Sequence, residues 1–176
     1  PALLLDINPF LGSNSGGLTS RSEDHTLLVW NQSRQVLFSA GRTCSTALFA
    51  YDVNDQTLDT ILVTAAELIP SITPSGRYYN YVYRHPNCVS TDTIPAGLYY
   101  SDDQGANWTG PISNENFGRP RFMTFVNDQV GYMAWGGYFA NFYSPEIDTF
   151  GLIRKTIDGG QTWTMVLETD RSFSRF

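Results

Sequence analysis

The chain has 176 residues, enough for one domain with a substantial core. Hydrophobic residues make up 41% of it and aromatic residues 14%, whereas only 16% are charged, a composition that excludes an intrinsically disordered chain. The net charge of −6 provides no basic surface for phosphates, which argues against nucleic-acid binding. No apolar run reaches the roughly 18 residues of a transmembrane helix, so we expect no insertion into a membrane.

The first part of the sequence, residues 1–24, is interpreted as an extended N-terminal arm. An apolar start at residues 2–5 is followed by Pro9 and by a Gly- and Ser-rich stretch at residues 12–17, which is the composition of a linker. We expect this arm to dock on a partner. Residues 25–176 are expected to form the folded domain.

Short runs rich in β-branched and aromatic residues follow the arm, separated by clusters of turn-forming residues, and they predict strands. These runs are Thr26–Trp30, Gln35–Ala40, Thr46–Val53, Leu58–Val63, Arg77–Arg84, Gly97–Ser101, Arg121–Val126, Val130–Trp135, Gly151–Thr156 and Thr162–Leu167. One helical turn is predicted at Thr64–Leu68, where Pro70 would end it. The predicted fold class is therefore all-β.

The same pattern of residues occurs twice in the second half of the chain. Residues 100–108 read YSDDQGANW and residues 155–163 read KTIDGGQTW. An eroded copy occupies residues 50–58, where Leu58 takes the position of the tryptophan. We therefore divide the domain into three β-repeats, at about residues 25–70, 77–115 and 120–168.

The shared pattern, Ser/Thr-x-Asp-x-Gly-x-x-Trp, resembles the Asp-box, also called the BNR repeat, of sialidases and other β-propellers. The matching residues are Ser101, Asp103, Gly105 and Trp108 in the first box and Thr156, Asp158, Gly160 and Trp163 in the second. In a tight hairpin the hydroxyl and the carboxylate accept hydrogen bonds from backbone N–H groups, the glycine supplies a positive φ, and the tryptophan buries apolar area. The third repeat as a whole resembles a blade of the photosystem-assembly-factor-like propellers.

This resemblance implies a β-propeller-like fold of about three four-stranded antiparallel blades. In families that carry Asp-boxes the hairpins lie at the outer edge of each blade, so Asp103 and Asp158 are interpreted as structural residues and not as a catalytic pair. A propeller usually has four to eight blades. We therefore expect the fold to be completed by oligomerisation or by further chain.

The sequence assembles no recognisable catalytic set. The order of Arg119, Pro120 and Arg121 differs from the arginine signature of sialidases, and no nucleophile elbow, phosphate loop or zinc-binding helix is present. We assign no catalytic residue, no metal ligand and no cofactor. A glycoside hydrolase with two catalytic carboxylates stays open as an alternative, because the sequence alone does not pair any two of the 17 Asp and Glu residues.

Two aromatic segments are the candidate binding surfaces. One places three tyrosines on the same face of a predicted strand, and the other is a long aromatic stretch in the third repeat. The residues are Tyr79, Tyr81, Tyr83, Trp135, Tyr138 and Tyr143. Tyrosine and tryptophan suit protein interfaces and sugar stacking, because they bury a large area while keeping a polar group. The alternative is that these side chains form an ordinary core.

Cys44 and Cys88 allow one disulfide but not a four-cysteine zinc site. Two separate buried thiols and a disulfide in an extracellular protein both stay open.

The sequence thus favours a non-enzymatic structural or interaction module of a surface, secreted or virion assembly. We expect it to be extracellular, at the cell surface or associated with a virion, and to contact protein partners or further copies of itself. A glycan-binding, lectin-like propeller and a fragment of a glycoside hydrolase are the alternatives.

Overall fold

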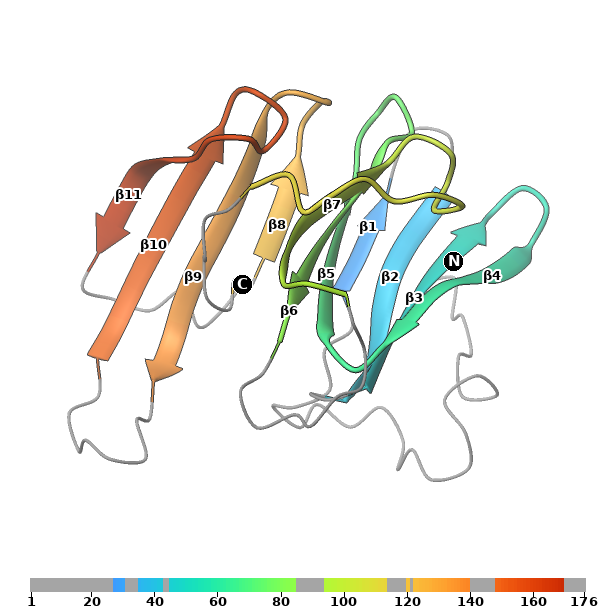
Figure 1. Cartoon of the computed structure of the whole chain (residues 1–176), viewed down its shortest axis with the longest axis horizontal. Helices are drawn as coiled ribbons and strands as arrows, with labels where there is room; N and C mark the ends of the chain where they lie inside the picture. The colour runs from blue at the N-terminus through green and yellow to red at the C-terminus, as the bar shows by residue number, and fades with distance from the viewer. Residues whose placement is uncertain are drawn as a thin grey trace, which may run out of the picture.

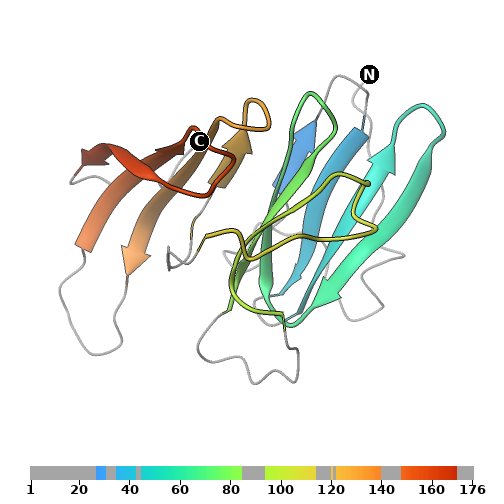
Figure 2. The same cartoon turned by 45° about the horizontal axis from the view of Figure 1, so that its top comes forward.

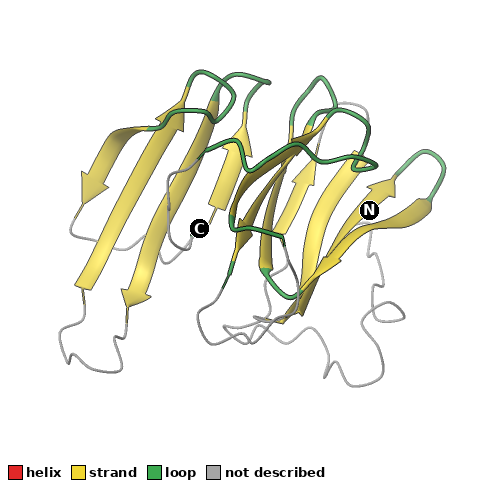
Figure 3. Ribbon diagram, in the orientation of Figure 1, coloured by secondary structure: helices red, strands yellow, loops and turns green. Residues whose placement is uncertain are grey.

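The computed structural model describes residues 27–30, 35–42, 45–84, 94–113, 120, 122–139 and 148–169. The regular secondary structure of these residues consists of β-strands in three antiparallel sheets (Figures 1 and 3). The prediction of an all-β fold is confirmed. Within the same residues no helix has the length and apolar character needed to cross a membrane.

Each sheet is built from strands that follow one another along the chain. The first sheet contains β1 (Leu27–Trp30), β2 (Gln35–Arg42), β3 (Ser45–Asp52) and β4 (Thr57–Thr64). The second contains β5 (Glu67–Ile72), β6 (Tyr78–Tyr83) and β7 (Gly97–Ser101). The third contains β8 (Phe122–Phe125), β9 (Gly131–Phe139), β10 (Asp148–Thr156) and β11 (Thr164–Thr169).

The chain after β7 partly completes the second sheet. The backbone N–H of Tyr100 donates to the carbonyl of Thr109 (3.0 Å), and the N–H of Thr109 donates back to the carbonyl of Tyr100 (2.9 Å). Further along, the N–H of Ile112 donates to the carbonyl of Leu98 (2.9 Å). Residues 109–112 therefore lie along β7 as an incomplete fourth strand, and the three sheets share one order of strands.

The helical turn predicted at Thr64–Leu68 is wrong. Thr64 ends β4, and the residues from Glu67 onward form β5, which pairs with β6. Pro70 is tolerated in this strand because β5 lies at the edge of its sheet, where one side of the backbone needs no ladder hydrogen bond. The second sheet thus begins at Glu67, inside the stretch that we assigned to the first repeat.

The three sheets stack face to face, with the second sheet in the middle (Figures 1 and 2). Their first strands lie side by side, since β5 contacts both β1 and β8. Every residue of β5 is buried, and so is every residue of β6 except Tyr83. Both faces of the second sheet are buried because each is covered by a neighbouring sheet, as in sheet-on-sheet packing generally.

The apolar side chains form three clusters that follow this stacking. The first and second sheets share a cluster that includes Leu37, Leu48, Tyr78 and Val82. The second and third sheets share a larger one, whose members are Ile69, Tyr79, Tyr81, Leu98, Met123, Phe125, Met133, Trp135 and Trp163. The third cluster, Phe38, Phe49 and Tyr51, lies on the other face of the first sheet.

Candidate functional site

The first Asp-box forms the hairpin between β7 and the incomplete fourth strand of the second sheet. The hydroxyl of Ser101 accepts hydrogen bonds from the N–H groups of Asp103 (3.3 Å) and Gly105 (2.7 Å) and donates to Oδ1 of Asp103 (2.8 Å). That same Oδ1 accepts from the N–H of Asn107 (2.8 Å). Two side chains therefore satisfy backbone donors that the turn would leave unpaired.

The second Asp-box joins β10 to β11 and repeats these bonds. The hydroxyl of Thr156 accepts from the N–H groups of Asp158 (3.3 Å) and Gly160 (2.9 Å) and donates to Oδ1 of Asp158 (2.7 Å). Asp158 Oδ1 accepts from the N–H of Thr162 (2.9 Å), and its Oδ2 accepts from the Thr162 hydroxyl (2.6 Å). The two hairpins are equivalent bond for bond around their hydroxyl and carboxylate groups.

These bonds set the acidity of both carboxyl groups. Burial raises the pKa of Asp158, but hydrogen bonds from Thr162 and Thr156 outweigh it and bring that pKa to about 2. The side chain and backbone of Asn107, together with the Ser101 hydroxyl, lower the pKa of Asp103. Both carboxylates are therefore ionised at neutral pH, and their oxygens are engaged within the hairpin.

The glycine of each box rests on the sheet that precedes it. Gly105 and Gly160 have φ angles of +89° and +94°, which favour glycine. A Cβ on Gly160 would overlap Cδ2 of Leu98 in β7, and a Cβ on Gly105 would overlap Cγ2 of Ile61 in β4. We call the aliphatic side chains that contact a box glycine its socket: Leu98 and Ile112 for Gly160, and Ile61 for Gly105. Glycine is required here by close packing as well as by backbone conformation.

The tryptophans reach toward the same preceding sheets. Trp163 is buried in the core between the second and third sheets, and its Nε1–H donates to the carbonyl of Gly160 (3.0 Å). Trp108 packs against the core between the first and second sheets, where its buried Nε1–H has no hydrogen-bond partner among the described residues. Each box thus fastens its own sheet to the one before it.

The eroded copy of the box occupies the equivalent place in the first sheet, between β3 and β4. Its turn has different bonds, because Asp52 Oδ1 accepts from the N–H groups of Asn54 (2.7 Å) and Asp55 (3.3 Å). The residue with positive φ is Gln56 (+55°). Leu58, in the tryptophan position, packs against the cluster of Phe38, Phe49 and Tyr51.

The aromatic side chains that we singled out as candidate binding residues are largely core residues. Tyr79, Tyr81 and Trp135 are 0%, 1% and 5% exposed between the second and third sheets, and Tyr83 packs partly buried against the same cluster. This burial agrees with the alternative that these side chains form an ordinary core, because the third sheet covers them. The Tyr138 side chain, Tyr143, Cys44, Cys88 and the arm at residues 1–24 lie outside the described residues.

Polar contacts join the second and third sheets beside this core. The hydroxyl of Ser71 accepts from the N–H of Phe125 (2.8 Å), and the hydroxyl of Tyr79 donates to the carbonyl of Asp128 (2.8 Å). The Tyr79 ring also stacks on Phe125, with ring centroids 3.6 Å apart. Burial raises the pKa of the Tyr79 hydroxyl, so it stays a donor at neutral pH.

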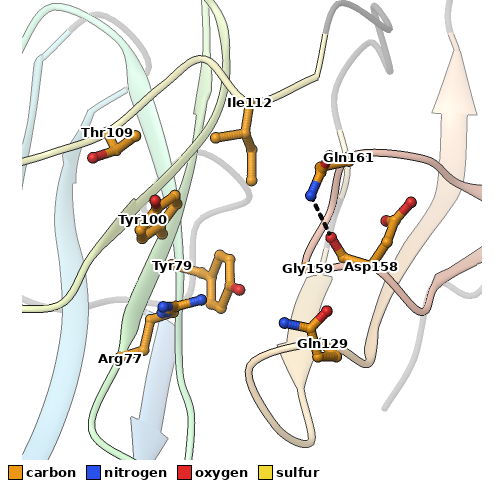
Figure 4. A pocket seen from close by; sticks show the side chains of 9 residues that line it. All are labelled: Arg77, Tyr79, Tyr100, Thr109, Ile112, Gln129, Asp158, Gly159 and Gln161. Atoms are coloured by element: carbon orange, nitrogen blue, oxygen red, sulfur yellow. Dashed lines mark hydrogen bonds between the residues drawn. The ribbon is translucent and has the colours of Figure 1, made fainter.

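A groove of about 320 Å³ opens between these two sheets near the second Asp-box (Figure 4). Its walls come from β6, β7 and the incomplete fourth strand on one side, and from two turns of the third sheet on the other. The lining residues are Arg77, Tyr79, Tyr100, Thr109, Ile112, Gln129, Asp158, Gly159 and Gln161. Of these, only Tyr79 and Asp158 were singled out from the sequence, because lone glutamines and arginines in turns carry no local signal.

Arg77 is held in a fixed position at the wall of this groove. Its Nε and Nη2 atoms lie 2.6 Å and 3.1 Å from the two carboxylate oxygens of Asp102, and its guanidinium lies over the Tyr100 ring at 4.6 Å from the centroid. The hydrogen bond to Asp102 is the main reason why the pKa of Arg77 is raised. The described residues contain no group of three His, Cys, Asp or Glu side chains that would bind a metal ion.

Comparison with known proteins does not assign the chain to a family. The chain matches no model of a protein family, and it has no significant match among curated proteins.

The acidity of Asp158 is tested by removing its strongest donor. In Thr162→Val the hydroxyl bond to Oδ2 is lost, so we expect the pKa of Asp158 to rise from about 2 toward its ordinary value. Because the folded-state pKa is depressed, the stability from this carboxylate is present above about pH 4 and is lost as pH falls toward 2. An NMR titration of the Asp158 carboxyl carbon measures the shift, and an unchanged pKa would contradict the assignment.

The contact between Gly160 and its socket is tested against a glycine in open space. Gly76 has nearly the same φ (+93°), but nothing lies within 4 Å of a Cβ placed there. Both alanine variants carry the same backbone strain, so we expect Gly160→Ala to lower the free energy of unfolding by a further 1–3 kcal/mol or so, the usual cost of overpacking. Urea unfolding of the two variants measures the difference, and equal losses would show that the socket is unimportant.

Proposed function

We propose that the protein is a non-enzymatic interaction module whose Asp-box sheets form an open, propeller-like array. Three observations support this arrangement. The first strands of successive sheets lie side by side, the box hairpins occupy the same place in the second and third sheets, and each hairpin rests on the preceding sheet. Among the described residues no further sheet covers the outer face of the third sheet, and we propose that this face is where assembly occurs.

The outer face of the third sheet has apolar residues at the positions equivalent to those that contact Gly160 on the second sheet. Arg154 lies over Trp135 on the core side, so its neighbour Ile153 points to the outer face. Ile153 pairs with Leu167 of the neighbouring strand β11. In the second sheet the equivalent neighbours are Leu98 and Ile112, which share a backbone hydrogen bond. Leu167 is 45% exposed. The single observation that carries the proposal is this exposed socket, which no glycine of the described residues occupies.

Further apolar surface surrounds the exposed socket. Phe122 pairs with Ala134 on the same outer face and is 43% exposed. Tyr132 also lies on this face, with the ammonium of Lys155 at 5.8 Å from its ring centroid. An apolar patch with an aromatic ring and a polar margin is typical of a protein–protein interface.

The first sheet, at the other end of the array, indicates how a second copy of the chain would bind to the outer face of the third sheet. On the outer face of the first sheet Phe38, Phe49 and Tyr51 are only 1%, 4% and 8% exposed, so these side chains are not available to a further copy. A head-to-tail ring of copies would need both faces. We therefore propose a symmetric dimer in which two third sheets pack against each other.

None of the carboxyl groups with a shifted pKa among the described residues suits the acid of a glycosidase. A glycosidase requires one carboxylic acid with a raised pKa. The shifted carboxyl groups of the described residues, Asp103, Asp128 and Asp158, all have lowered pKa values. A place in a surface, secreted or virion assembly is part of this proposal and rests on the sequence alone.

Self-association through the exposed socket is tested with two variants on one strand. Leu167→Asp puts a charge on the outer face of β11, and we expect it to weaken dimerisation at least about tenfold, because the lost burial of one leucine is worth roughly 1.5–3 kcal/mol. Met165→Asp is the matched control, since Met165 is 57% exposed but pairs with Arg154 on the core side. Sedimentation velocity over a concentration series measures both.

Two results would contradict the proposal. One is a wild-type chain that stays monomeric at every concentration. The other is an equal loss of association in both variants, which would place the interface elsewhere on β11.

A further inference from the structure

The groove between the second and third sheets has the size of a small-ligand site. Its volume of about 320 Å³ lies within the roughly 300–1,000 Å³ common for such sites. Residues from both sheets contribute to it, so it exists only when the sheets are stacked. It is separate from the outer face of the third sheet, because its walls lie on the side that faces the second sheet.

The charged groups around the groove are already compensated. Arg77 is paired with both oxygens of Asp102. The carboxylate of Asp158 points away from the opposite wall (Figure 4) and accepts bonds from Thr156 and Thr162. A ligand in the groove would therefore meet few uncompensated charges, which disfavours an anion or a cation as the natural occupant.

Neutral polar groups in the groove are available to a ligand. The side-chain amide of Gln129 has no hydrogen bond to another described residue, and Figure 4 shows its nitrogen directed toward the opposite wall. Gln161 uses only its Nε2–H, which donates to the carbonyl of Asp158 (3.2 Å). The hydroxyl groups of Tyr100 and Thr109 are likewise unbonded among the described residues. Amides and hydroxyls both donate and accept hydrogen bonds, as sugar hydroxyl groups do.

The groove also offers a small apolar wall. Ile112 and the ring of Tyr100 lie on the side of the second sheet, opposite Gln161 and Gln129 (Figure 4). One aliphatic side chain and an aromatic ring provide apolar surface for the C–H groups of a sugar ring, while the amides meet its hydroxyl groups. We propose that this groove binds a neutral sugar residue, with Gln129 and Gln161 as the main hydrogen-bonding groups.

The proposal is tested by titrating the full chain with neutral sugars and following two-dimensional ¹⁵N NMR spectra. The probes are glucose, galactose, mannose, fucose and N-acetylglucosamine, with N-acetylneuraminic acid as a charged comparison. We expect at least one neutral sugar to shift the side-chain amide signals of Gln129 and Gln161, with a Kd on the order of millimolar, as few ligand atoms make contact. The methyl glycoside of that sugar separates a glycan residue from a free sugar, and we expect it to bind at least as well.

Single substitutions assign the binding to the groove. Gln129→Ala and Gln161→Ala each remove an exposed side-chain amide that would bond to the sugar. We expect the fold to be retained and the affinity for the sugar to fall about five- to tenfold. Asn54→Ala removes an exposed amide from the turn of the first sheet and leaves the affinity unchanged. The proposal is overturned if no neutral sugar moves the two glutamine signals, if only the charged sugar does, or if both glutamine variants bind like the wild type.

Discussion

The close contact between a box glycine and the preceding sheet is the constraint on which the rest of this structure depends. The hydroxyl and carboxylate of Thr156 and Asp158 hold the turn in shape, and this shape brings the backbone of Gly160 onto Leu98 without a side chain between them. Trp163 then fills the space beside the contact. The bonds inside the turn are local, but their consequence is long-range, because they fix how closely two sheets stack.

The same contact explains both proposed surfaces. Where a sheet is followed by another, its socket is filled, and the remaining gap beside the hairpin becomes the groove lined by Gln129 and Gln161. On the third sheet, over which no further sheet lies among the described residues, the equivalent pair is the partly buried Ile153 and the exposed Leu167. Stacking thus leaves a small polar site inside the array and an apolar face at its end.

The sequence predicted the features that depend on neighbouring residues. The strands other than β5 and both box hairpins follow from short patterns, and they appear close to where those patterns lie. Pro70 misled the prediction, because a proline ends a helix but is also accepted in an edge strand, and only the pairing with β6 decides between them. The sequence left two interpretations of the aromatic face with Tyr79 and Tyr81, a binding surface and an ordinary core. This face is covered by a sheet some 50 residues away in sequence, and no local pattern shows such a cover. The groove residues were missed for the same reason, since separate strands and turns bring them together.

The most direct test of the claim that the outer face of the third sheet is the assembly surface is hydrogen–deuterium exchange of the intact chain below and above its association concentration. The account predicts that association slows exchange in β10 and β11, around Ile153 and Leu167, and leaves β2 and β3 unchanged. Slower exchange in β2 and β3 with no change in β10 and β11 would contradict it, because the first sheet would then be the surface on which assembly takes place.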